Sequence, residues 1–265
     1  MSDGFFSELV DWLSDPLHWS GQFGIPNRLQ EHLVMSVVSV GIAMAIALPL
    51  GMYIGHKRRY EFAVVSVANF GRAIPSFGLL FLFVLWLGLG LDSPPSLRPP
   101  VIFALVLLAI PPILTNTYVG IQGVDPDTLE AARGMGMTER GVLARIELPL
   151  GAPLIIAGLR TAAVQVVATA TLGAVVAGGG LGRYIVDGFA LGPASPTGRA
   201  QLFAGALLVA LLAILTEIGF GLLERVVSPR MTSQGRKRRP GQEPLQHAGQ
   251  VGPPAWPTGI GSAGS

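Results

Sequence analysis

The residues that could do covalent chemistry are few in this chain of 265 residues. It has no cysteine, which excludes disulfides, thiolate metal sites and a cysteine nucleophile. None of the four histidines stands in the H-E-x-x-H pattern of a metalloprotease. The only lysines, Lys57 and Lys237, do not follow a glycine, so the ATP-binding sequence G-x-x-x-x-G-K-[ST] is absent. We therefore expect no catalytic residue, no metal site and no directly bound cofactor.

Several polar residues lie inside long apolar runs. Polar groups at membrane depth are costly and usually face a cavity or a neighbouring helix. Two interpretations stay open for them: they line a path for a solute, or they fix helix packing through hydrogen bonds. The candidates for the path are Asn69, Arg72, Asn116, Thr161, Gln165 and Thr169.

The charged residues of these runs have simpler interpretations as well. Arg72 and Arg160 are near the ends of their runs, from which a long side chain can reach the water interface. Glu217 lies about two turns before Arg225 and is expected to pair locally or to face water. His56 flanks the basic residues that follow it, and we expect it to be a plain interfacial residue.

A glycine-rich segment follows the fourth apolar run and could act as a gate. Equally, it could only cap the helix that it follows, because glycine is the usual residue past a helix end. The candidate gate residues are Gly178, Gly179, Gly180 and Gly182.

The long loop from Asp125 to Pro149 has the strongest local signals. Asp125 followed by Pro126 is a favourable helix start, because aspartate caps free amides and proline fits the first turn. A second short helix is expected over 138–147 and should end at Pro149. Gly136 permits the turn between the two pieces. By itself this pattern predicts a helical hairpin that is amphipathic.

The same loop resembles the EAA loop of bacterial ABC importer permeases. Glu130-Ala131-Ala132, then Gly136, then Ile146-x-Leu148-Pro149 stand at the spacing of that signature. The stretches 116–121, 131–137, 159–165 and 178–182 resemble the glycine betaine, carnitine, choline and proline subfamily, as does Ile74-Pro75-Ser76. The resemblance covers about residues 30–227 and leaves out the tail.

The resemblance implies a function and a set of partners. The EAA loop of such permeases forms a coupling helix that docks on a separate ATPase, so Glu130, Ala131, Ala132, Gly136, Ile146, Leu148 and Pro149 are the expected ATPase-coupling residues. ATP and magnesium would sit on a cytoplasmic ATPase dimer. A second permease copy or a paralogue and an extracytoplasmic solute-binding protein are also implied. The expected solute is an osmoprotectant, with another small solute such as an amino acid as the alternative.

These residues must be positioned by membrane helices, because 50% of the chain is hydrophobic and only 13% is charged. An apolar run of about 20 residues spans a bilayer. We predict an all-α polytopic protein with spans at 33–54, 62–91, 101–119, 154–177 and 202–223. The second run could hold two helices, which would give six spans. Pro49, Pro75 and Pro111-Pro112 are expected to break their spans.

Charge sets the expected orientation, because cytoplasmic loops carry an excess of lysine and arginine. With five spans, most of the 18 Lys and Arg residues fall on the side of the 125–149 loop, together with 57–59 and 225–239. This predicts an inner-membrane protein with its N-terminus outside and its C-terminus in the cytoplasm. Six spans would separate the first basic cluster from the loop. Acidic residues within spans are scarce, which disfavours an ion-coupled secondary transporter.

The two ends differ from the centre. Residues 1–32 form an extracytoplasmic segment whose start has apolar residues at helical spacing and should lie as a helix in the outer interface. Residues 33–227 form the permease domain with its coupling loop at 120–150. Residues 228–265 are rich in glycine and proline without apolar periodicity, so we expect a disordered cytoplasmic tail.

Overall fold

The computed structural model describes residues 2–59, 62, 64, 66, 75–176, 178–192 and 194–227. They all belong to one compact unit, Met1–Pro229, and every regular element among them is a helix. Asn69 and Arg72, Ile74 and the tail expected to be disordered lie outside the described residues. The predicted all-helical class is confirmed for the part of the chain that the structure covers.

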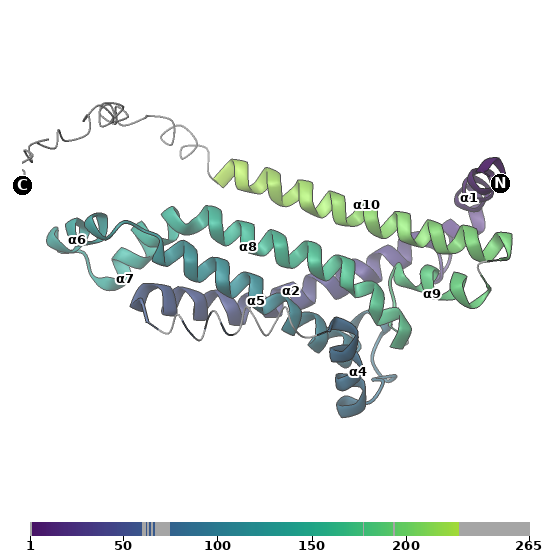
Figure 1. Cartoon of the computed structure of the whole chain (residues 1–265), viewed down its shortest axis with the longest axis horizontal. Helices are drawn as coiled ribbons and strands as arrows, with labels where there is room; N and C mark the ends of the chain where they lie inside the picture. Colours follow the sequence, from purple (N-terminus) through teal and green to yellow (C-terminus); the bar gives the residue numbers. More distant parts are fainter. Residues whose placement is uncertain are drawn as a thin grey trace, which may run out of the picture. The chain divides into compact units, whose positions relative to one another are not determined.

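Figure 1 shows the order of the helices. The N-terminal part contains α1 (Ser2–Ser14), the 3₁₀ turn η1 (Pro16–Trp19) and the long α2 (Ile25–Lys57). Then follow α4 (Ser76–Leu87), the turn η2 (Pro95–Leu97) and α5 (Pro99–Gln122). The loop region holds α6 (Pro126–Gly134), α7 (Glu139–Val142) and the π turn η3 (Leu143–Glu147). The C-terminal half comprises α8 (Leu148–Thr169), the 3₁₀ segment η4 (Ala170–Val176), α9 (Gly182–Ala190) and α10 (Pro196–Val227).

The core lies where α5 packs between α2 and α8, and these three helices run side by side in Figure 1. Glycines allow the close approach. A Cβ on Gly51 of α2 would lie 2.8 Å from Thr117 Cβ of α5, and one on Gly158 of α8 would lie 2.5 Å from Asn116 Cβ. Because backbones meet at small residues, van der Waals packing rather than bulk hydrophobicity holds these helices together in a bilayer.

Length and composition allow four of these helical stretches to cross a membrane: Ile25–Lys57, Pro99–Gln122, Glu139–Val176 and Pro196–Val227. The helix α4 is apolar and shorter, and it follows the part of the second predicted span that is not described. The end of α2 meets the loop after α5, since Arg58 Nη2 donates to Val124 O at 2.8 Å. Pro95 lies at the opposite end of the bundle, and its backbone carbonyl accepts a hydrogen bond from Gly179 N at 3.0 Å.

These contacts bear on the choice between five and six spans. The chain leaves the Arg58 end, reaches the Pro95 end and returns through α5, which brings residues 57–59 and the 125–149 loop to the same side. Six spans would have placed them on opposite sides. Four spanning stretches and the shorter α4 are present among the described residues, and the number of five spans stays a prediction.

The predicted proline breaks are only partly right. Pro75 does precede a helix start, at Ser76. However, α2 continues through Pro49 and α5 continues through Pro111-Pro112. A long apolar helix packed on its neighbours tolerates the lost hydrogen bonds of a proline, because surrounding groups and small local adjustments satisfy the freed carbonyls.

The N-terminal helix α1 packs against the start of α10. Arg199 binds the Glu8 carboxylate through two nitrogens, the shorter contact being 2.7 Å. Trp12 is 7% exposed and stacks on the His18 ring with centroids 4.0 Å apart. The predicted helix is therefore present and docked, while its location in the outer interface stays a prediction.

Candidate coupling loop and solute pathway

The loop between α5 and α8 has its own small hydrophobic core. Leu129 and Ala132 of α6 are 2% exposed, Val142 of α7 is fully buried, and Val124 completes the cluster. Ile146 and Met137 pack against it. The Asp125 side chain accepts a hydrogen bond from Asp127 N at 3.0 Å, which caps α6 as the sequence predicts. The loop is thus a packed unit that can transmit force.

Gly136 makes the turn between the two pieces. Its φ of +85° lies in the left-handed region, which side chains with a Cβ rarely adopt. Across this turn Arg133 binds Glu139, with Nε at 2.9 Å and Nη2 at 3.2 Å from the carboxylate oxygens. The hydrogen bond to Glu139 raises the pKa of the Arg133 guanidinium above its ordinary value. The ion pair ties the end of α6 to the start of α7.

The predicted coupling residues divide into exposed and buried ones. Glu130 and Ala131 are exposed on α6 and are available to a partner. Ala132, which is also among the expected coupling residues, is buried in the loop core and is not exposed to a partner in this conformation. Beside α6 the surface is hollowed by a pocket lined by Met135, Gly136, Met137, Thr138, Arg140, Gly141, Ala144 and Arg145.

The segment Ile146-Glu147-Leu148-Pro149 joins the loop to α8 without a break. The expected end of the second short helix at Pro149 is wrong, because a π turn over Leu143–Glu147 leads directly into α8. Leu148 N donates to Leu143 O, which is the wider hydrogen bond of a π turn. Pro149 then occupies the first turn of α8, where its missing N–H does no harm.

Glu147 is the most deeply placed charged residue of this region. It is 1% exposed, and its Oε2 lies 2.5 Å from His56 Nδ1 at the end of α2. The other ring nitrogen, Nε2, lies 3.2 Å from Glu139 Oε2. His56 is therefore not the plain interfacial residue that the sequence suggests. No local pattern could reveal this, because the two partners are 91 residues apart.

The pathway candidates that are described do not form one polar cluster. Asn116 Nδ2 donates to Pro112 O at 2.8 Å, and Thr161 Oγ1 donates to Ala157 O at 2.9 Å, so both side chains bond to their own helices. Gln165 is half-buried on α8. Both bonds lie within one helix and do not join neighbouring helices, so the packing role and the role along a path both stay predictions.

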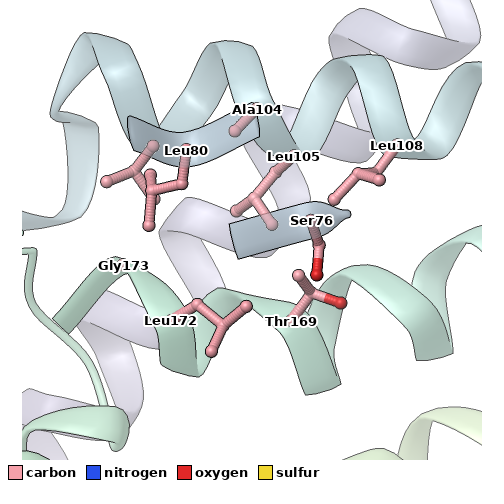
Figure 2. A pocket seen from close by; sticks show the side chains of 9 residues that line it. Ser76, Leu80, Ala104, Leu105, Leu108, Thr169, Leu172 and Gly173 are labelled. Carbon is pink, nitrogen blue, oxygen red and sulfur yellow. The ribbon is translucent and has the colours of Figure 1, made fainter. Parts of the chain in front are cut away.

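Thr169 lines a small apolar cavity between α4, α5 and the end of α8. Figure 2 shows it close to Ser76, so that two hydroxyl groups lie at one end of the cavity and leucines fill the rest. The cavity measures about 10 Å³, which is room for about one water molecule. In this conformation it cannot hold a solute.

Arg160 is bound to another helix and does not merely reach the interface. Its guanidinium donates to Glu217 through Nε at 2.7 Å and to Glu224 through Nη1 at 3.4 Å, both on α10. The expectation that Glu217 pairs locally near Arg225 is thus wrong, although its side chain stays 42% exposed. Arginine suits this bridge, because its planar fork can serve two carboxylates one above the other.

The glycine-rich segment follows η4 and is buried. Gly180 has a φ of +85°, and its N–H donates to Glu31 Oε2 of α2 at 2.9 Å. A Cβ on Gly179 would lie 2.5 Å from that same oxygen, and one on Gly180 would lie 3.0 Å from His32 Nδ1. Close approach to α2 therefore explains Gly179 and Gly180, whereas a Cβ on Gly178 or Gly182 would meet the backbone of η4, and the role as a gate stays a prediction.

Comparison with known proteins identifies the family. Residues 47–229 match the family "Binding-protein-dependent transport system inner membrane component". The carnitine transport permease protein OpuCD of Listeria monocytogenes is 39% identical over 81% of this chain and 90% of its own. The glycine betaine/carnitine/choline permease protein OpuCB of Bacillus subtilis is 35% identical over 76% and 87%. The osmoprotectant import permease protein OsmW of Salmonella typhimurium is 32% identical over 76% and 90%.

Solved structures support the fold. An inward-facing structure of the MetNI methionine ABC transporter superposes with a TM-score of 0.66 at 21% identity, covering 81% of this chain and 99% of that one. An amino acid ABC transporter crystallised with histidines gives a TM-score of 0.56 at 20% identity, covering 86% and 98%. With these matches, the chain belongs to the binding-protein-dependent transport system inner membrane components and is a multi-pass ABC importer permease.

Proposed function

We propose that this permease imports an osmoprotectant, such as glycine betaine, carnitine, choline or proline, with energy from ATP hydrolysed by a separate subunit. This solute class is supported by the names of the relatives, which mention carnitine, glycine betaine, choline or osmoprotectants. Import of another small solute, such as an amino acid, by the same machinery is the alternative. The choice of solute rests on the relatives and not on a site in this chain.

The observation that carries the proposed coupling role is the packed loop with Glu130 and Ala131 on its exposed side. A short rigid element with one acid and one small residue outward fits a groove on a partner protein. We infer that a pair of cytoplasmic ATPases, which hold ATP and magnesium, dock here. A solute-binding protein docks outside, and a second permease copy or a paralogue completes the pathway.

The proposed orientation places α6 and α7 in the cytoplasm and α1 outside. Arg58 contacts the carbonyl of Val124, so the first basic cluster and the loop share one face, and that face is rich in arginine. The positive-inside bias then assigns it to the cytoplasm. The basic residues of 225–239 predict a cytoplasmic C-terminus by the same charge rule.

The test uses cells that express this chain with its ATPase and binding protein. Uptake of radiolabelled glycine betaine, carnitine, choline and proline is measured at high osmolarity, with amino acids as competitors. We expect Glu130→Lys to lower uptake at least about tenfold, because a reversed charge at a docking site costs coupling energy of that order. Thr128→Ala, on the exposed part of the same helix, serves as the control.

Two results would change the proposal. Full ATP-driven uptake with Glu130→Lys would remove the coupling role from this loop. Uptake of amino acids but of no quaternary ammonium compound would favour the alternative solute. Amounts of permease in the membrane are compared by immunoblot, so that poor insertion is not mistaken for lost coupling.

A further inference from the structure

The helix α2 touches the two regions that an importer must link. At one end it contacts the coupling loop, and at the other it contacts the glycine-rich segment that precedes α9. Both contacts use charged or hydrogen-bonding side chains that are largely buried. This arrangement was not visible in the sequence, because neither contact is local.

The inner contact consists of His56 with Glu147 and Glu139. His56 is 10% exposed as a side chain, and both of its ring nitrogens face carboxylate oxygens, at 2.5 and 3.2 Å. A carboxylate as buried as Glu147 needs a partner, since an unpaired buried charge is strongly unfavourable. Glu139 continues the chain of contacts to Arg133 at the end of α6. The end of α2 is thus connected to the helix that carries Glu130.

The outer contact consists of Glu31 and His32 with the other end of the bundle. Glu31 accepts a hydrogen bond from Gly180 N at 2.9 Å. His32 is fully buried, and its Nε2 is 2.9 Å from Val167 O of α8. The two side chains therefore hold the glycine-rich segment and the outer part of α8 against α2.

Between these contacts α2 is one uninterrupted helix. It has 33 residues and continues through Pro49. The 25 steps from Glu31 to His56 correspond to about 37 Å at the rise of an α-helix. Because α2 packs on α5 along one face and packed interfaces shift between discrete arrangements, we expect it to move as a unit.

We propose that α2 mechanically links the coupling loop to the glycine-rich segment, and that His56 is the positioning residue that fixes its inner end to Glu147. Movement imposed on α6 by an ATPase reaches Glu147 and Glu139, passes through the His56 ring to α2, and displaces Gly180 through Glu31. This inference rests on the proposed function as an ATP-driven importer.

The test compares His56→Ala and His56→Asn in proteoliposomes that contain the complete transporter. Asparagine retains an N–H donor near the position of Nδ1, whereas alanine has none. We expect uptake per ATP hydrolysed to fall at least about tenfold with His56→Ala and to stay within about twofold with His56→Asn. Arg59→Gln, at an exposed neighbouring position, is the control.

A second measurement reports on the outer end. Phe189 of α9 is 68% exposed, and the chain has no native cysteine, so Phe189→Cys can be labelled specifically. We expect ATP to change its labelling rate in the otherwise unaltered protein and with His56→Asn, but not with His56→Ala. If His56→Ala does not assemble, Glu147→Gln, which keeps the side-chain volume, takes its place.

The outcomes separate the possible failures. Absence of ATP-driven uptake by the unaltered transporter would contradict the proposed function itself. If the unaltered transporter works, unchanged uptake per ATP with His56→Ala overturns the link through α2. So does an ATP-dependent labelling change that survives in that variant. If both His56 variants lose uptake equally, and only in proportion to the amount of assembled transporter, His56 serves packing alone and the proposed link is wrong.

Discussion

At the scale of single residues, Gly136 is required by its backbone and not by its surroundings. Its φ is +85°, and no atom lies within 4 Å of a Cβ placed there. Gly134, two residues earlier, has an ordinary φ and equally open space. The two glycines therefore differ in backbone conformation but not in free space, and they form a matched pair for mutation.

We expect Gly136→Ala to impair transport, because the left-handed conformation costs a residue with a Cβ about 1–2 kcal/mol, which strains the turn. Gly134→Ala should be harmless or slightly stabilising, by up to about 1 kcal/mol from helix propensity. ATP-driven uptake and co-purification with the ATPase are the measurements. Equal behaviour of the two variants would contradict the role of the turn.

Arg160 provides the second residue-scale prediction. It bridges Glu217 and Glu224, so Arg160→Met leaves two carboxylates of α10 without their cation. We expect a lower thermal unfolding temperature in detergent, and a smaller decrease for Glu217→Gln. Combining Arg160→Met with Glu217→Gln should cost less than the sum of the two single changes, because the double variant loses their shared interaction only once. Additive losses in this double-mutant cycle would show that the two residues do not interact.

At the scale of elements, the candidate coupling loop has a hydrophobic core of its own. Substitutions in this core and substitutions on the exposed face should therefore have different effects. Ala132 is buried, so Ala132→Leu overpacks the loop at a cost of about 1–3 kcal/mol. Ala131 is exposed, so Ala131→Leu should leave the loop intact but obstruct a close partner.

Limited proteolysis and ATPase co-purification distinguish the two effects. We expect Ala132→Leu to make the loop more susceptible to protease in membranes with the cytoplasmic face exposed. Ala131→Leu should leave the protease pattern unchanged and reduce co-purification. If Ala131→Leu binds the ATPase normally, this face of α6 is not the docking face.

What the sequence could predict depended on whether the signal was local. The Asp125-Pro126 start, the Gly136 turn and the apolar runs are local patterns, and the start, the turn and four of the five runs correspond to observed elements. The continuation of helices through prolines could not be predicted, because it depends on neighbouring helices. The pairs His56–Glu147 and Arg160–Glu217 join residues 91 and 57 positions apart. A single sequence gives no measure of such proximity.

At the scale of the whole molecule, one permease chain leaves much apolar surface uncovered. Only 6% of the most apolar 18-residue stretch of α10 is buried inside the bundle, against 67% of the corresponding stretch of α5. In a bilayer such a surface faces lipid or another subunit. The other face of α10 carries small residues such as Gly205, which pack on α9. Lipid or another subunit must therefore cover this apolar surface. The orientation of the helices in the membrane then decides which loops an ATPase can reach.

The lack of cysteines in the sequence makes the orientation directly testable with single substitutions. Met135 is 78% exposed in the coupling loop, and Asp92 is exposed in the loop between α4 and α5. We expect a membrane-impermeant maleimide to label Asp92→Cys in intact cells and Met135→Cys only after the membrane is opened. The reason is the excess of arginine beside the coupling loop, which resists translocation. Labelling of Met135→Cys from outside would invert the topology, and an ATPase in the cytoplasm could then not reach Glu130.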